Sequence, residues 1–236
     1  MKTIPIFVVC VLPLFAQKPA FEATSVKPNR SGTVQSIGIN IAGPRIVGEN
    51  LPLRTLIQQA YGVLDFQIDG GPKWIDSERF DIQAGTGRST AIQLSELGPL
   101  LQELLADRFH LVTHRETKER QRYVLLVDKE GLKLQATQGT PAQSMSVANR
   151  KMIGEGVTMG ALAYRIAVQP MFAGRTVVNK TGLSGFYDFT LEWEAGEDAE
   201  ASLLRALREQ LGLRLSSEKG PVEVLVIDRA EQPSEN

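Results

Sequence analysis

The only two histidines of the chain, His110 and His114, lie four residues apart and are the first candidates for metal chemistry. On a helix, this spacing would place both imidazoles on one face, where they could bind one ion. The residues around them alternate between apolar and polar types, however, which predicts a strand. Four strand residues span roughly 13 Å at ~3.3 Å each, too far for two imidazoles that bind one zinc ion at ~2.0–2.1 Å. We therefore expect no metal site, with one histidine solvated and the other hydrogen-bonded to a neighbouring strand.

Two glycine-rich segments resemble catalytic loops only in part. Gly85–Gly87 could begin a phosphate-binding loop, but the chain contains no G-x-x-x-x-G-K-[ST] motif. Gly182–Gly185 (Gly-Leu-Ser-Gly) lacks the spacing of the G-x-S-x-G nucleophile elbow. The sequence therefore predicts no cofactor and no catalytic residue at either segment.

Pairs of carboxylates are the remaining source of acid–base chemistry. Asp76 with Glu78, and Asp188 with Glu192, have the residue types that a hydrolase needs. Surface carboxylates are far commoner than catalytic ones, and the sequence does not give the distance between these groups. An envelope hydrolase with carboxylates in a cleft between two modules is thus an alternative function rather than the first.

Four residues are candidates for binding, namely Tyr61, Trp74, His114 and Arg115. A tryptophan in a Gly-Pro loop is either a lid on the core or a recognition aromatic, and the lid is the favoured interpretation for Trp74. Together with Tyr61 it could instead line a small-molecule pocket. The charged run Arg115–Arg122 is expected to form a hairpin tip, which either discourages edge pairing or serves as a docking loop.

The N-terminal segment indicates export. Lys2, an apolar run that ends at Phe15, and the small residue Ala16 predict a secretory signal peptide over residues 1–16. The run is too short to serve well as a membrane anchor. Cys10, the only cysteine, lies inside it, so the mature chain would have no disulfide and no thiolate nucleophile. We expect a periplasmic or secreted protein.

The charge and length of the chain narrow the possible partners. A formal net charge of −1 leaves no basic excess for binding nucleic acid. No second apolar run is long enough to cross a membrane. The residues that follow the signal peptide are sufficient for one or two hydrophobic cores.

Four sequence matches in the same order indicate that the chain contains two copies of one module. The matched segments are Ile46–Leu53 with Met152–Met159, Phe80–Ile82 with Tyr187–Phe189, Leu100–Leu104 with Leu203–Leu207, and Val124–Asp128 with Val224–Asp228. Any one match could arise by chance because apolar runs are common. Four matches at nearly constant separation favour a tandem duplication.

Each copy is expected to be a small α+β module with two helices packed on one face of a mainly antiparallel sheet. The first helix of the first copy would bury a face of five residues, with Asn50 as its N-cap. These residues are Leu53, Leu56, Ile57, Ala60 and Tyr61. The second helices are expected over Leu97–Ala106, with Pro99 in the first turn, and over Ala199–Leu211.

A hairpin is expected to close each module. The first would pair Phe109–Arg115 with Arg122–Asp128, and the second Arg214–Ser217 with Val222–Asp228. The expected division of the chain is a signal peptide (1–16), a first module (17–134), a linker (135–143), a second module (144–230) and a flexible tail (231–236).

Several runs together resemble an uncharacterised family of exported proteins expanded in soil Acidobacteria. The runs are Phe21–Asn29, Ala60–Val63, Gly70–Ile82, Leu105–Phe109, His114–Lys118 and Thr181–Trp193. Related domains occur attached to membrane sensor-peptidases of the beta-lactam-sensor type, which implies sensing or docking outside the cytoplasm. This chain has no H-E-x-x-H motif and none of the sensor's transmembrane helices. Gly98-Pro99 departs from the continuous helix that the resemblance implies before Leu100.

Each module is also similar to the short N-terminal domain of secretins and TonB-dependent transducers, a small α+β unit that pairs with partner proteins. We therefore expect an extracytoplasmic interaction or sensing module, not an enzyme, that binds a protein or cell-envelope partner. Strand addition to an exposed sheet edge is the expected mode. An envelope hydrolase and a small-molecule binding protein are the alternatives. The sequence leaves the partner and the oligomeric state open.

Overall fold

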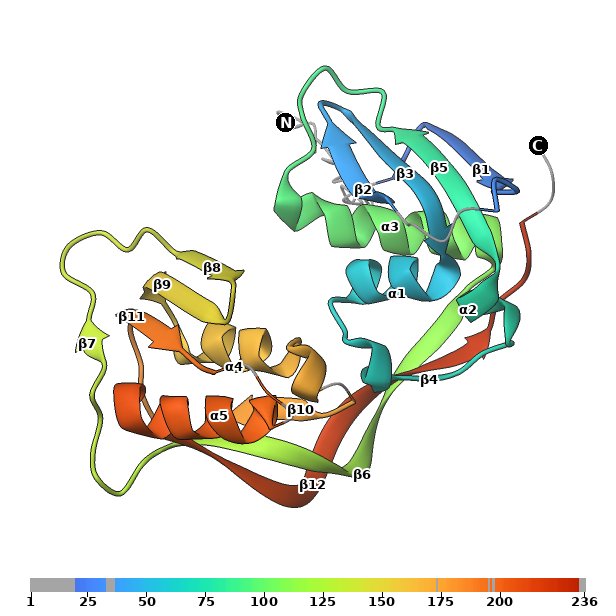
Figure 1. Ribbon diagram of the computed structural model, residues 1–236. Coiled ribbons are helices and arrows are strands. Elements are labelled where there is room, and N and C mark those ends of the chain that lie inside the picture. The colour runs from blue at the N-terminus through green and yellow to red at the C-terminus, as the bar shows by residue number, and fades with distance from the viewer. Residues whose placement is uncertain (1–19, 33–36, 173, 195, 197, 234–236) are drawn as a thin grey trace, which may run out of the picture.

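The computed structural model describes residues 20–32, 37–172, 174–194, 196 and 198–233. Within them it contains five α-helices and three mainly antiparallel sheets, which confirms the predicted α+β class. Figure 1 shows two lobes joined by a long two-stranded ribbon. The expected signal peptide lies outside the described residues.

The first lobe is an antiparallel sheet with helices on one face, and its strands lie in the order β1-β5-β3-β2 (Figure 1). The strands are β1 (Ala23–Pro28), β2 (Ile37–Ala42), β3 (Arg45–Pro52) and β5 (Arg79–Gly85). The helices are α1 (Leu53–Tyr61), α2 (Trp74–Ser77) and α3 (Leu94–Phe109), with a 3₁₀ turn η1 (Asp65–Gln67) after α1. The predicted apolar face of α1 is buried, with Tyr61 partly so.

The second lobe has the corresponding arrangement, with strand order β7-β11-β9-β8. The strands are β7 (Gln135–Ala136), β8 (Ser144–Ala148), β9 (Lys151–Val157) and β11 (Tyr187–Glu192). The helices are α4 (Met159–Ala167), a 3₁₀ turn η2 (Pro170–Phe172) and α5 (Ala199–Ala206), which continues as a π-helical turn η3 (Leu207–Leu211). The segment expected as a linker, 135–143, thus contributes β7 to this sheet.

The ribbon consists of two long antiparallel strands, β6 (Val112–Val127) and β12 (Leu213–Arg229). The short strands β10 (Thr176–Asn179) and β4 (Ile68–Gly70) flank it in parallel, in the order β10-β6-β12-β4. The prediction of a hairpin at the end of each module is therefore wrong. The run Arg115–Arg122 contains no Gly, Pro, Asn or Asp that would favour a turn, so it continues as strand.

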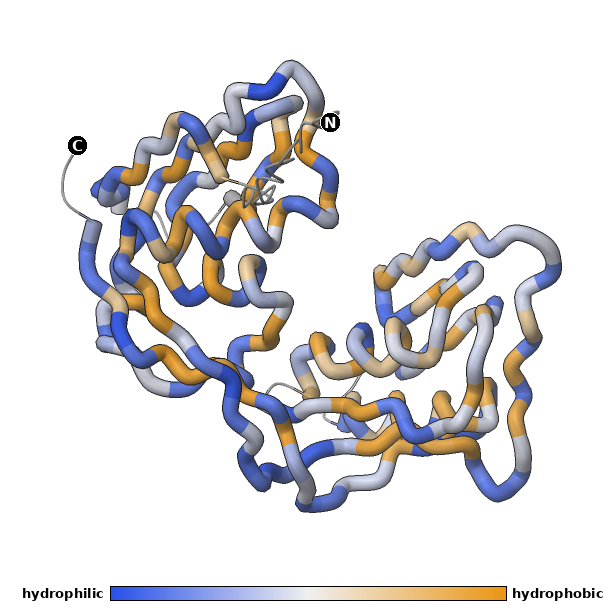
Figure 2. Tube along the Cα trace, turned by 180° about the vertical axis from the view of Figure 1, so that it is seen from behind, coloured by the Kyte–Doolittle hydropathy of each residue, from blue (hydrophilic) through white to orange (hydrophobic). Residues whose placement is uncertain are grey.

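Each lobe has its own hydrophobic core, and each core includes residues from the other half of the chain. Leu225 and Ile227 of β12 belong to the core of the first lobe. Tyr123 and Leu125 of β6 belong to the core of the second. Figure 2 shows polar residues where the ribbon crosses between the lobes. Neither half of the chain therefore completes its own core.

The two sheets share a β-bulge at the corresponding position. Pairing shifts between Gly48 and Leu51 in the first lobe, and the corresponding shift in the second lobe lies where β9 pairs with Tyr187–Phe189. The bulge residues Asn50 (φ 55°) and Gly156 (φ 65°) are left-handed, a conformation that Asn and Gly tolerate best. Asn50 therefore does not cap α1 as expected. The helix follows Pro52 instead.

One aspartate holds each bulge. The Asn50 N–H donates to Asp81 Oδ1 at 2.9 Å, and the Gly156 N–H donates to Asp188 Oδ1 at 2.7 Å. Each carboxylate also accepts a side-chain bond from the residue that follows the neighbouring edge strand, Asn29 or Thr137. Both aspartates therefore satisfy backbone groups that the bulge removes from the ladder.

Asp81→Ala and Asp188→Ala are each expected to lower the free energy of unfolding by about 1–3 kcal/mol, because a backbone N–H loses a charged acceptor. Denaturant titration measures the change. Glu155→Ala is the matched control, since Glu155 is an exposed acid beside the second bulge. Equal stabilities for the control and the two aspartate variants would contradict this role.

Helix α3 runs through Pro99 without a break, so the expected start of this helix near Leu97 is wrong. The chain enters the helix at Leu94, and the Gln93 N–H donates to Glu96 Oε2 at 2.9 Å. This cap satisfies a donor that the helix leaves free at its N-terminus. Pro99 consequently lies within the helix rather than in its first turn.

Candidate functional site: free strand edges

The structure places each histidine beside a different carboxylate. His114 Nδ1 lies 2.9 Å from Asp228 Oδ2, and His110 Nδ1 lies 3.7 Å from Glu231 Oε2. His110 ends α3 in a left-handed conformation, whereas His114 lies within β6. The described part of the chain contains no group of three or more His, Cys, Asp or Glu side chains that could hold a metal ion.

Arg115 links the ribbon to the end of α1. Its guanidinium forms an ion pair with Glu223 and donates to the Tyr61 carbonyl at 3.4 Å. Arg115 and Tyr61, two of the predicted binding residues, are therefore in contact. The contact involves the backbone of Tyr61 and not its ring. The aromatic ring of Tyr61 packs partly buried against the first core.

Trp74 occupies the position of a lid on the core. Its ring stacks on Phe109 with centroids 6.4 Å apart, and meets Phe80 edge-on at 6.3 Å. This geometry is the one expected of a lid, the interpretation that the sequence favours for Trp74. These two aromatic contacts account for the residue by packing alone.

Each of the acids considered for a hydrolase has a partner. Asp76 pairs with Arg54, and Glu192 pairs with Lys151 at 2.7 Å. Asp188 holds the second bulge, and Glu78 accepts a hydrogen bond from Gln232. All four carboxylates therefore have structural contacts where the sequence suggested acid–base chemistry.

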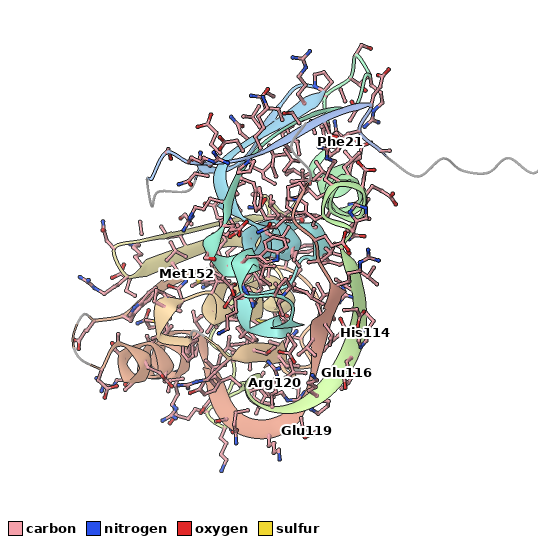
Figure 3. All side chains as sticks on the ribbon, turned by 90° about the vertical axis from the view of Figure 1, so that its right-hand side faces the viewer. Phe21, His114, Glu116, Glu119, Arg120 and Met152 are labelled. Atoms are coloured by element: carbon pink, nitrogen blue, oxygen red, sulfur yellow. The ribbon has the colours of Figure 1, made fainter. Side chains whose placement is uncertain are left out.

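Ion pairs join the first lobe to the ribbon. Asp69 of β4 accepts hydrogen bonds from Arg120 at 2.6 Å and from Lys118 Nζ at 2.9 Å. Partial burial alone would raise the pKa of the Asp69 carboxyl, but the bonds and charges of Arg120 and Lys118 outweigh it and lower the pKa. Figure 3 shows Arg120 on the curved ribbon, together with His114, Glu116 and Glu119.

Asp69→Asn is expected to destabilise the protein by about 1–3 kcal/mol at neutral pH, and less in acid. Folding lowers the pKa of this carboxyl, so its contribution is fully present above the unfolded pKa of about 3.9 and disappears as the pH falls through the folded value. Denaturant titrations of both proteins between neutral pH and pH about 2 measure this. A constant difference across that range would contradict the assignment.

A second ion-pair group joins the ribbon to β10 with the charges reversed. Lys180 Nζ lies 2.9 Å from Glu218 Oε1, and the same oxygen accepts from the Arg122 guanidinium at 2.6 Å. Arg122 is 9 % exposed and lies over Gly220, where a Cβ atom would come within 2.6 Å of its guanidinium. Gly220 therefore gives room for this arginine within an unbroken strand.

The sheet of each lobe has an open groove, and the two grooves lie at corresponding ends of these sheets. One, of about 650 Å³, is lined by residues that include Glu22, Arg45 and Arg88. The other, of about 500 Å³, is lined by residues that include Lys151 and Glu192. Each groove mixes both signs of charge and therefore favours no one class of small ligand.

The sheet edges differ in how they are protected against pairing with another chain. Lys27 and Pro28 lie on the edge strand β1. β10 pairs with β6 only from Arg122 to Leu125, and five of the six residues from Arg115 to Arg120 before this pairing are charged. Lysine, proline and dense charge are the usual means by which proteins prevent edge pairing. Among the edge strands of five or more residues, β2 and β8 contain no charged residue and no proline. The shorter edge strands β7 and β10 also lack both.

Comparison with known protein families identifies a family to which the chain belongs. A family model described as a protein of unknown function (DUF3738) matches residues 54–230. The chain belongs to the DUF3738 family. The matched part of this DUF3738 chain begins in α1 and ends just after β12, so it includes the ribbon and the whole second lobe. No curated protein and no solved structure matches it.

Among the described residues of this DUF3738 chain, no helix is long and apolar enough to cross a membrane. The sequence patterns did not indicate the edges of β2 and β8 as candidate sites. Their lack of charge is visible in the sequence, but the position of a strand at the edge of a sheet depends on distant pairing.

Proposed function

We propose that this DUF3738 chain is an extracytoplasmic, non-enzymatic interaction or sensing module that binds a protein partner of the cell envelope by strand addition. The observation that carries the proposal is the contrast between protected and unprotected edges. β2 and β8 occupy corresponding places in the two lobes, and neither has the charge or proline found on the edge strand β1. An extended segment of the partner would add to one or both of these edges.

The backbone of β8 is oriented for this role. Ala148 and Lys151 flank a two-residue hairpin turn and form its closing pair. Alternation along the strand then directs the N–H and C=O groups of Met145 and Val147 away from β9. The Met145 carbonyl accepts a long bond, 3.4 Å, from Arg165. Each backbone bond to a partner would contribute about 0.5–1.5 kcal/mol.

The proposal includes a tandem duplication of one module. Corresponding strand orders, the two aspartate-held bulges, and a further pair of backbone bonds support it. Thr86 N–H donates to Pro44 O at 3.0 Å, and Trp193 N–H donates to Arg150 O at 3.1 Å at the matching place. A duplicated module would offer two similar edges on one rigid chain, and a partner that engages both would gain from the high effective concentration.

The proposed location of the protein outside the cytoplasm is inferred from the sequence. The expected signal peptide and the resemblance to domains attached to beta-lactam-sensor-type peptidases favour an envelope partner. The similarity of each module to the short N-terminal domains of secretins and TonB-dependent transducers also favours pairing with a protein. A small α+β module of this kind does not define a partner by its fold alone.

An edge-directed variant tests the proposal. Asn40→Lys combined with Ser146→Lys adds one charge to each edge strand, at exposed positions that leave both cores intact. Partner capture from the envelope fraction of the native host, measured by quantitative mass spectrometry, is expected to fall at least tenfold relative to the unmodified chain.

The matched control adds the same charges one strand further in. Val47 pairs with Asn40, and Ile153 pairs with Ser146, so Val47→Lys with Ile153→Lys places lysines on the same sheet faces but away from the edges. This control is expected to capture the partner normally. Equal capture by both double variants would rule out strand addition at β2 and β8.

A further inference from the structure

The outer edge of β11 is occupied differently from the corresponding edge in the first lobe. There, β1 pairs with β5 over six residues, from Ala23 opposite Gly85 to Pro28 opposite Phe80. In the second lobe, β7 pairs with β11 at Tyr187 and Asp188 only. Within the described residues, no strand lies beside the remainder of β11, up to Glu192, on this edge.

A side chain takes the place of the missing strand. The Glu192 N–H donates to Gln210 Oε1 at 3.0 Å, and Gln210 Nε2 donates to the Glu192 carbonyl at 2.7 Å. In the first lobe the corresponding carbonyl, that of Gly85, accepts a backbone N–H from Glu22 at 2.8 Å. The primary amide of Gln210 therefore reproduces the hydrogen bonds of a strand residue.

The backbone of Thr190 faces the same edge. The Phe186 carbonyl accepts from Thr137 N–H on this side, and Glu192 bonds Gln210 on this side. Because alternate residues of a strand direct their N–H and C=O groups to the same edge, Thr190 directs its pair there too. Its side chain is exposed.

The chain before β7 turns away from β11 and leaves a groove. Lys133 N–H donates to the Leu211 carbonyl at 3.0 Å, so this segment follows the end of η3 instead of β11. A groove of about 430 Å³ lies beside the free edge, lined by residues that include Lys133, Thr190 and Gln210. Gln210 belongs to the π-helical turn η3, a feature found frequently at functional sites.

We infer that the free edge of β11 is a peptide-binding site, in which an extended segment of a partner protein lies antiparallel to Thr190–Glu192 and displaces the Gln210 amide. β1 shows what such a segment looks like, since it fills the same place in the first lobe. Its residues Ala23, Thr24 and Ser25 are small and uncharged. The site rests on the proposed mode of strand addition, but not on the edges of β2 and β8.

The experiment uses a blocked synthetic peptide with the sequence of residues 20–26, titrated into the isotope-labelled full chain. The backbone amides of Thr190 and Glu192 are expected to shift in NMR spectra at submillimolar to millimolar peptide. Gln210→Ala removes the competing amide and is expected to tighten binding roughly tenfold, the equivalent of about 1.4 kcal/mol. The same peptide with alternate backbone nitrogens methylated is expected not to bind.

A second pair of variants separates the backbone from the side chain. Thr190→Pro removes the N–H that faces the groove and is expected to abolish the shift at Glu192, whereas Thr190→Val keeps that N–H and is expected to bind normally. Should Thr190→Pro fail to fold, the comparison of Gln210→Ala with the unmodified chain still decides.

Three results would overturn the inference. The first is no shift at Thr190 or Glu192 in Gln210→Ala at millimolar peptide. The second is a shift confined to β5, which would mean exchange with the chain's own β1. The third is a shift confined to β8 that Ser146→Lys abolishes, which would support the proposed function while excluding this site.

Discussion

Leu162→Asp is expected to unfold both lobes, although the side chain lies in the core of only one. Leu162 is fully buried in α4. Loss of a buried leucine costs about 2–5 kcal/mol, and a buried carboxylate adds to this, whereas whole domains are stable by about 5–15 kcal/mol. Loss of the second core would release β6 and the first half of β12. The first core would then lose the support that positions Leu225 and Ile227.

The measurement is thermal unfolding followed by circular dichroism and by tryptophan fluorescence. Trp74 packs on the first core and Trp193 belongs to the second, so fluorescence of single-tryptophan variants reports each lobe separately. Tyr164→Asp is the matched control, because Tyr164 is 57 % exposed on the same helix. A Leu162→Asp protein with a native first lobe would show that the lobes fold independently.

Cleavage of the chain between the lobes is expected to leave the two fragments together. A protease site inserted after Gly139, in an exposed segment, would cut the chain between β7 and β8. The fragments would remain joined by the full pairing of β6 with β12 and by the parallel pairs β4–β12 and β10–β6. Each fragment would also retain residues in a core that it shares with the other.

Size-exclusion chromatography under native conditions is expected to show one species of unchanged size after complete cleavage. Addition of denaturant should separate the fragments, and its removal should restore the complex. An intact chain without the inserted site, treated with the same protease, is the control. Two separate native fragments would contradict the exchange of strand ends between the lobes.

Local patterns predicted the elements that depend on local physics. The apolar spacing of α1 predicted its buried face, since helical periodicity places such residues together. The matched segments favour a tandem duplication, which stays a prediction, and the strand orders of the two lobes correspond. Both kinds of pattern extend over a few neighbouring residues and need no knowledge of distant contacts.

The errors arose where distant contacts decide the conformation. Gly220 and Pro221 have the composition of a turn, yet they pair with Arg120 and Glu119 in an unbroken strand. Asparagine is a residue type that often caps helices, yet Asp81 holds Asn50 in a bulge. In both cases a partner far away in the sequence stabilises a backbone that local propensity does not favour.

The candidate binding edges also depend partly on local sequence and partly on distant contacts. The absence of charge in β2 and β8 is a local property, but their edge position is set by the topology of each sheet. The free edge of β11 depends on the diversion of Lys133 towards Leu211, and on the amide of Gln210. No sequence pattern predicts either contact, because glutamine is common on exposed helical turns.

The continuity of the ribbon also restricts how this chain can change over time. Leu213, at the start of β12, belongs to one core, and Leu225, near the end of the same strand, belongs to the other. Side chains alternate between faces, so loss or gain of a single residue in the polar middle would turn one end inside out. The number of residues in the middle of β12 is therefore held constant from both sides, because each end of the strand belongs to a different core.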